Sequence, residues 1–210
     1  MDRVVSARGR RAWSEGPWCP PQNMAEVTVT PATFTMVDYD ASRIAALVSR
    51  VADDIGLPAD TQIRVDVDEH TPLGASSLAS LDPIVIKVES GALEDAKNPR
   101  HLSERNVIGL SARLLFRAHD RSTAAFADAP ADDDLTSSQS VAWDVYSVGR
   151  TARLGYPSQR GRRQYHFRIR HGFNDRTDEV FDRLWSGEGL TWRDIAAACE
   201  ETATSLQIVS

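Results

Sequence analysis

The chain has 210 residues, of which 41% are hydrophobic and 26% are charged, and its formal net charge is −6. These fractions are ordinary for a folded protein and exclude a chain that is disordered throughout. No apolar run approaches the roughly 18 residues that a membrane-spanning helix needs, so we expect no such helix and no membrane partner.

The first 23 residues hold four arginines, two tryptophans and three prolines without a periodic pattern. We therefore predict a disordered or extended arm over residues 1–23 and one globular domain over residues 24–210. Met24 is an alternative start of the protein. The arm lacks the apolar segment of a secretory signal, and the only two cysteines form no CxxC pair, so we expect a cytoplasmic protein with free thiols.

Helix and strand patterns alternate in the N-terminal half. Apolar residues recur at helical spacing over residues 40–55, where Asp40 or Ser42 can cap the start and Gly56 the end. Residues 62–68 and 83–89 predict two strands, the first by strict alternation. We expect a Gly/Ser-rich loop, residues 71–80, between them.

The C-terminal half is predicted to be helical. Helices are expected over residues 103–121, 138–154 and 177–186 and from residue 191 onward, with an acidic loop over 123–138. Residues 160–171 fit both a strand and a helix, and we favour a helix because helices surround them. Strands followed by helices predict an α+β fold, with a short sheet in the N-terminal half.

No catalytic signature is present. The sequence lacks HExxH, a GxSxG nucleophile, a P-loop and a GxGxxG fingerprint. Asp66, Asp68 and His70 would share one face of a strand and are weak metal candidates, although we favour the interpretation that they form the polar outer face of a half-buried strand. We therefore expect no catalytic residue, no metal and no cofactor, and the interpretation leans away from an enzyme.

Positive charge is concentrated in one segment. Residues 150–176 hold eight arginines and one acid, a charge of +7, so the rest of the chain carries −13. Guanidinium groups bind phosphates and aromatic rings can stack on bases. The predicted anion- or partner-binding residues are Arg160, Arg162, Arg163, Tyr165, His166, Arg168 and Arg170. The alternative is that these arginines pair with the chain's own acids, including Asp132–Asp134.

The order of the predicted elements resembles that of small zincin-type metallopeptidases. The resemblance covers about residues 40–156, with strand 83–89 lining a cleft, helix 103–121 in the place of the HExxH helix and Asp144 in the setting of an acidic third ligand. Helix 103–121 has no paired histidines one turn apart, so zinc would lack two of three ligands. The resemblance thus implies a zincin-like fold without a zinc site or peptidase activity.

Three functions follow from these patterns. We favour a non-enzymatic protein that binds an anionic ligand or a protein partner through its arginine and aromatic side chains. The alternatives are a nucleic-acid-binding module that uses the same residues and a diverged metal-dependent hydrolase. The predicted partners are accordingly a nucleic acid, a phosphate-bearing ligand or another protein, and the oligomeric state is left open.

Overall fold

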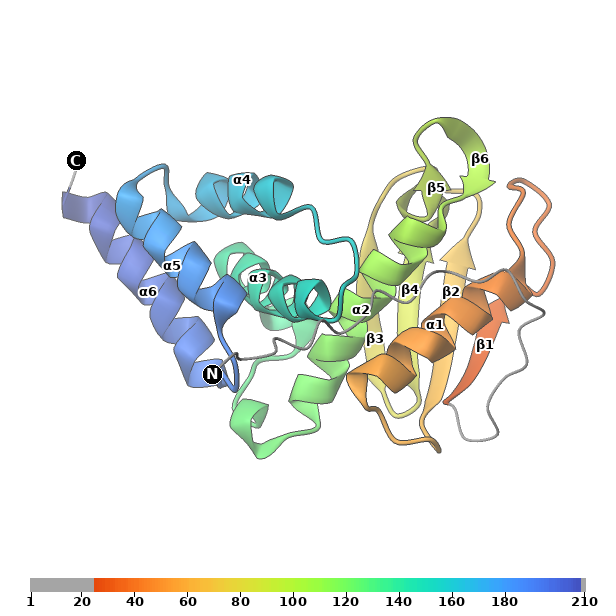
Figure 1. The fold of residues 1–210 in the computed structure, drawn as a ribbon, viewed down its shortest axis with the longest axis horizontal. Helices are drawn as coiled ribbons and strands as arrows, with labels where there is room; N and C mark the ends of the chain where they lie inside the picture. Colours follow the sequence, from red (N-terminus) through yellow and green to blue (C-terminus); the bar gives the residue numbers. More distant parts are fainter. Residues whose placement is uncertain (1–24, 209–210) are drawn as a thin grey trace, which may run out of the picture.

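A computed structural model describes residues 25–208 of the chain (Figure 1). The arm predicted over residues 1–23 lies outside the described residues. The described residues form six α-helices, a mixed four-stranded sheet and a two-stranded sheet, with the strands in the N-terminal half and the helices toward the C-terminus. The α+β prediction is confirmed.

Four strands make up the larger sheet. They are β1 (Glu26–Thr30), β2 (Gln62–Asp68), β3 (Ser76–Leu81) and β4 (Ile84–Glu89), in the spatial order β1-β2-β4-β3. Strands β1, β2 and β4 run parallel, and β3 pairs antiparallel with β4. In the centre, Val65 pairs with Val29 on one side and Ile86 on the other. The strands predicted over 62–68 and 83–89 are confirmed.

The loop predicted over residues 71–80 is wrong in its second half. Residues 76–81 form β3, and a register shift between Leu78 and Ser80 interrupts its pairing with β4. Leu78 is its only buried residue, because the strand lies at the edge of the sheet. The strand therefore has no alternating apolar pattern to detect. The small hairpin of β5 (Glu94–Asp95) and β6 (Asn98–Leu102) was also not predicted, since its residues are polar and mostly exposed.

Two helices cover one face of this sheet. Helix α1 (Ala41–Ile55) connects β1 to β2, and α2 (Glu104–Arg121) lies beside it (Figure 1). The predicted cap is confirmed, because Asp40 Oδ1 accepts from the backbone N–H of Ser42 at 2.8 Å and Gly56 ends α1 with φ of 84°. The first hydrophobic core lies between these two helices and the sheet. Its residues with almost no exposure include Ile44, Leu47, Ile63, Ile86, Leu114 and Leu115.

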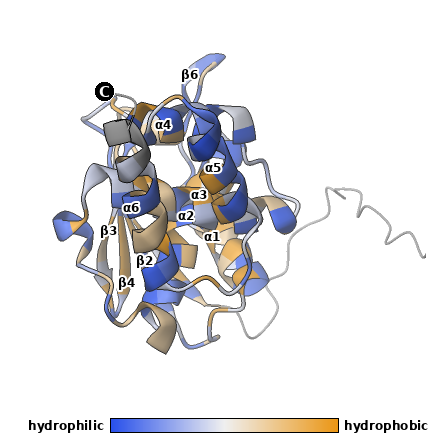
Figure 2. Cartoon of the chain, turned by 90° about the vertical axis from the view of Figure 1, so that its left-hand side faces the viewer, coloured by the Kyte–Doolittle hydropathy of each residue, from blue (hydrophilic) through white to orange (hydrophobic). Residues whose placement is uncertain are grey.

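The remaining helices enclose a second core. They are α3 (Ser137–Arg153), α4 (Arg160–His171), α5 (Asp175–Ser186) and α6 (Trp192–Ile208). Trp143, Phe167, Phe181 and Ile195 are fully buried among them. Figure 2 views this end of the molecule, where strongly hydrophilic and apolar segments alternate along the helices. Of the helices within residues 25–208, none combines the length and apolarity that crossing a bilayer requires.

The ambiguous segment 160–171 is a helix, as favoured. Phe167 and His171, one turn apart, are buried, whereas Tyr165 and Ile169 are 57% and 49% exposed. Tyr165, Phe167 and Ile169, which alternate with polar residues in the sequence, thus lie on two different faces of α4. This helix lies alongside α3, and its beginning is turned toward α2 and the sheet (Figure 1).

Candidate functional site

A pocket with a volume of about 330 Å³ lies where three helices meet the beginning of β3. Its walls come from α2, from the end of α3 with the connection that follows it, and from the first turns of α4. Gly74 and Ser76 beside β3, and Gly91 in the turn after β4, close the remaining side. The pocket therefore lies between the two hydrophobic cores, and residues far apart in the sequence build it.

The α2 wall presents residues at helical spacing. Arg105, Gly109 and Arg113 follow one another every four residues and so share one face of the helix. Gly109 keeps this wall open, because a Cβ atom placed there would have only the carbonyl oxygen of Pro157 nearby, at 3.9 Å.

The α4 wall supplies three further side chains that can carry positive charge. Arg162, Arg163 and His166 line the pocket from the first two turns of α4. Before them stands Gln159, whose φ of 46° is in the left-handed region that residues other than glycine rarely adopt. The chain thus turns sharply at Gln159 so that the start of α4 faces α2.

The charged side chains that line the described part of the pocket are all basic. Arg105, Arg113, Arg162 and Arg163 line it together with His166, whereas no Asp or Glu appears among the described residues that line it. Two helices also begin here, since Arg105 and Arg162 lie in the first turns of α2 and α4. The positive ends of both helix dipoles therefore add to the guanidinium charges.

A single carboxylate lies behind the pocket. Asp144 on α3 accepts from Nη1 of Arg113 at 3.0 Å and lies 3.4 Å from Nη1 of Arg163 and 3.5 Å from Nη1 of Arg117. Burial disfavours its ionised form, but these three guanidinium groups outweigh burial and hold the pKa of Asp144 below its ordinary value. Asp144 is thus shared by three arginines, and Arg117 also binds Asp132, which it shares with Arg121. These four arginines outnumber the two acids, so the cluster stays positive.

The two remaining pocket arginines, Arg105 and Arg162, have no acidic partner in the described part of the chain. Within residues 25–208, neither Arg105 nor Arg162 makes an ion pair or a side-chain hydrogen bond. Both side chains belong to exposed residues. They are thus available to an anion that enters the pocket, whereas Arg113 and Arg163 are already oriented by Asp144.

The structure separates the eight arginines of the basic segment. Six have an acidic partner: Arg150 with Asp120, Arg153 with Glu188, Arg160 with Asp182, Arg163 with Asp144, Arg168 with Asp178, and Arg176 with Glu179 and Glu201. Among the described residues, only Arg162 and Arg170 have none. Most of the +7 charge that stands out in the sequence is thus balanced by acids that lie elsewhere in the chain.

The seven predicted binding residues are likewise divided. Arg162, Arg163 and His166 meet in the pocket. Arg160 and Arg168 pair with acids of α5. Tyr165 and Arg170 are exposed on α4 and do not line the pocket, and the ring of Tyr165 lies 6.1 Å from that of Phe173.

Sequence reasoning missed Arg105 and Arg113. Both belong to α2, some 50 residues before α4 and outside the arginine-rich segment 150–176. A usable signal was present, because Arg113, Arg117 and Arg121 recur every four residues along helix 104–121, among apolar residues such as Leu114 and Leu115. Arginines in such a row need partners or a ligand.

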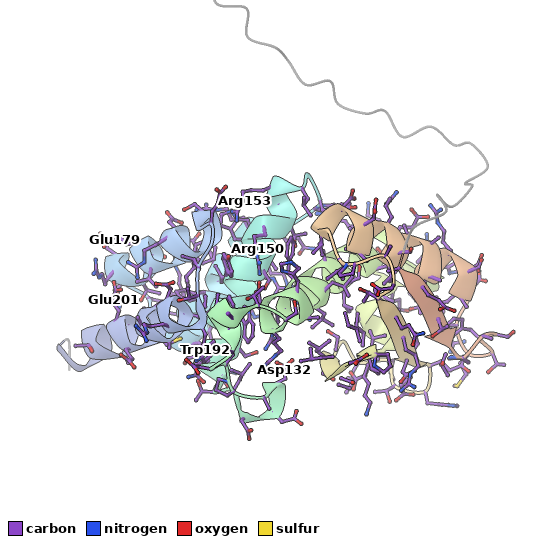
Figure 3. The ribbon with its side chains drawn as sticks, turned by 90° about the horizontal axis from the view of Figure 1, so that it is seen from below. Asp132, Arg150, Arg153, Glu179, Trp192 and Glu201 are labelled. Carbon is purple, nitrogen blue, oxygen red and sulfur yellow. The ribbon has the colours of Figure 1, made fainter. Side chains whose placement is uncertain are left out.

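Arg150 is a structural residue. Its two Nη atoms bind both oxygens of buried Asp120, at 2.6 and 2.5 Å, and Asp120 also accepts from Trp143 Nε1 at 2.8 Å. The guanidinium lies over the ring of Tyr146 with 4.0 Å to its centre. Figure 3 marks Arg150 together with Asp132, which binds Arg117 and Arg121. These contacts join α2 to α3 and leave no function for Arg150 in the pocket.

The weak metal candidates do not form a metal site in the described part of the chain. Within residues 25–208, no three His, Cys, Asp or Glu side chains are placed to hold a metal ion. Asp66 pairs with Arg64 at 3.0 Å, and Asp68 accepts from the backbone N–H of His70 at 3.0 Å and from the hydroxyl of Thr71 at 2.6 Å. A second, more open pocket of about 450 Å³ lies beside Asp66 and Asp68.

Comparisons with models of protein families, with curated proteins and with solved structures found no match. The resemblance in element order to small zincin-type metallopeptidases stays a prediction.

Proposed function

We propose that this protein binds a small anionic ligand, a phosphate or a phosphate ester, in the pocket between α2 and α4. The observation that carries the proposal is the pair formed by Arg105 and Arg162. They line one pocket from two helices, and neither has an acidic partner within residues 25–208. A cluster of like charges is unfavourable on its own and becomes favourable when an anion enters it.

Phosphate fits these groups better than a monovalent ion does. A guanidinium presents two parallel N–H groups that match two oxygens of a phosphate, and such charge-assisted hydrogen bonds are stronger than neutral ones. The first turns of α2 and α4 supply further positive potential from their backbone N–H groups. Arg113 supports the same arrangement, because its hydrogen bonds to Asp144 and to Ser76 Oγ hold it in one orientation.

Calorimetric titration of the purified chain with inorganic pyrophosphate at low ionic strength tests the proposal. We expect binding to one site, and we expect Arg162→Ala to weaken it about tenfold or more. The matched control is Arg170→Ala, which removes the same charge from the same helix at an exposed position outside the pocket. Absence of binding by the wild-type chain, or equal losses in the two variants, would contradict a site in the pocket.

A nucleic-acid-binding function is the second candidate. Tyr165 in the arginine-rich helix α4 and Phe173 just after it are 57% and 65% exposed, and exposed rings near cations can stack on the bases of a single strand. Fluorescence anisotropy with a labelled single-stranded oligonucleotide tests it. Binding that falls steeply with salt and is lost in Tyr165→Ala supports this candidate, and no binding at low salt rules it out.

A further inference from the structure

We propose that the ligand of the α2–α4 pocket is a sugar phosphate, meaning a phosphate ester of a small molecule rich in hydroxyl groups. This inference rests on the proposed function and specifies it. It follows from three properties of the pocket: its volume, the uncharged polar groups on its walls, and the absence of a flat aromatic wall among its described residues.

The pocket is larger than a phosphate ion requires. Its volume of about 330 Å³ is at the lower end of the range of small-molecule sites, and it equals the space of about ten water molecules. A lone phosphate ion fills roughly half of that or less. The remaining space is occupied by the part of the ligand to which the phosphate is attached.

The connection between α3 and α4 supplies uncharged hydrogen-bonding groups. Ser158 and Gln159 line the pocket, and neither side chain has a hydrogen-bond partner in the described part of the chain. Asn106 on the opposite wall donates from Nδ2 to the carbonyl oxygen of Glu94 at 2.7 Å, an interaction that fixes the orientation of its amide. Hydroxyls both donate and accept, so they can satisfy a serine and two amides at once.

The backbone conformation of Gln159 also supports a binding role for the connection between α3 and α4. Its φ of 46° is unfavourable for a residue with a side chain, and such conformations persist where the surrounding structure fixes them, often at binding sites. Gln159, which adopts this conformation, is itself one of the residues that line the pocket. The conformation also aims the first turn of α4, which carries Arg162, toward the same space.

The walls do not suit a nucleobase. His166 carries the only aromatic ring among the described residues that line the pocket, and apart from glycines the apolar lining is limited to Ala92, Leu110, Val148 and Pro157. Proteins hold bases mainly by stacking them on aromatic rings and by apolar contact, and the guanidinium groups that could also stack are the ones that the phosphate requires here. A hydroxyl-rich group needs neither, and it uses the polar groups that are present.

Calorimetric titrations of the wild-type chain with a panel of probes test the inference. The panel contains inorganic phosphate, glycerol 3-phosphate, ribose 5-phosphate, glucose 6-phosphate, glucose and AMP. We expect at least one sugar or polyol phosphate to bind about tenfold or more tightly than inorganic phosphate, glucose not to bind, and AMP to bind less tightly than the best ester. The inference is overturned if no ester exceeds inorganic phosphate, or if AMP binds most tightly.

Two variants separate this inference from the proposed function. Gln159→Gly removes the amide at a position where glycine adopts the backbone conformation without strain, and Ser158→Ala removes one hydroxyl. Each should weaken binding of the best ester about fivefold and leave binding of inorganic phosphate unchanged, whereas Arg162→Ala should weaken both. If inorganic phosphate, pyrophosphate and all of the esters fail to bind, the proposed function itself is wrong. If phosphate binds and the two variants affect ester and phosphate alike, only the sugar phosphate is excluded.

Discussion

Arg113 and Asp144 form an ion pair that joins the helical half of the molecule to the sheet beneath the pocket. Nη1 of Arg113 donates to both oxygens of Asp144, at 3.0 and 3.1 Å, and Nη2 donates to Ser76 Oγ at 2.8 Å. One guanidinium of α2 thereby contacts α3 and β3. Both side chains of the ion pair are less than 15% exposed, so the loss of either partner should also destabilise the fold.

Asp144→Asn is therefore expected to destabilise the protein by about 3 kcal/mol, because it leaves three neighbouring guanidinium groups without their shared carboxylate. Urea unfolding followed by circular dichroism measures the change. Asp133→Asn is the control, since Asp133 is exposed and has no ion pair within residues 25–208, and it should change the free energy of unfolding by less than about 0.5 kcal/mol. Equal effects of the two variants would show that Asp144 does not support the arginine cluster.

His171 is expected to make the stability fall in mild acid. Its Nδ1 lies 2.7 Å from Thr202 Oγ1 and its Nε2 3.1 Å from the carbonyl oxygen of Ser138, so it joins the end of α4 to α6 and α3. Burial lowers the pKa of His171 below its ordinary value of 6.5. As the pH falls, the unfolded chain takes up the proton before the folded chain does.

The contribution of His171 to stability is therefore complete above pH 6.5 and is lost as the pH drops below that value, by about 1.4 kcal/mol for each unit by which burial lowers the pKa. Urea unfolding, measured at pH values from 7.5 to 5 in steps of about half a pH unit, reports this loss. In His171→Gln the dependence on pH should be flatter, whatever the variant costs at pH 7.5. An unchanged dependence would assign the effect to another group.

Two helical glycines should respond to alanine in opposite directions. At Gly149 in α3, a Cβ atom would lie 2.1 Å from the carbonyl oxygen of Trp185, so Gly149→Ala must push α3 and α5 apart and should cost about 2 kcal/mol or more. At Gly109 in α2 there is room, and Gly109→Ala should stabilise the protein by about 1 kcal/mol because alanine favours a helix. Melting temperatures of the two variants test both signs. A stable Gly149→Ala variant would contradict the close packing of α3 on α5.

The parts of the fold that were predicted correctly have local causes. The Asp40 cap, the apolar spacing from Ile44 to Ile55 and the ending at Gly56 all lie within one short segment, and the helix there has the predicted limits. Strand β3 was missed because pairing with β4 creates it, while its own residues give no strand pattern.

The pocket was also predicted only in part, because contacts between elements far apart in the sequence build it. The arginines of α4 stand out in the sequence, but which of them are balanced by acids depends on contacts with α3, α5 and α6. Asp178 neutralises Arg168 across a turn, whereas Arg162, only six positions earlier, faces α2 instead. No spacing rule within α4 distinguishes these two arginines; the arrangement of the neighbouring helices does.

The most direct test of the central claim is to locate where an anion binds. Two-dimensional ¹H–¹⁵N NMR spectra of the labelled chain, recorded during titration with inorganic phosphate, report this for each backbone amide. An anion site between α2 and α4 predicts saturable shifts that cluster on residues 105–113 and 157–166, with little change at Arg170 and Phe173. Shifts centred on the exposed side of α4 around Arg170, or no saturable shifts in the pocket, would contradict it.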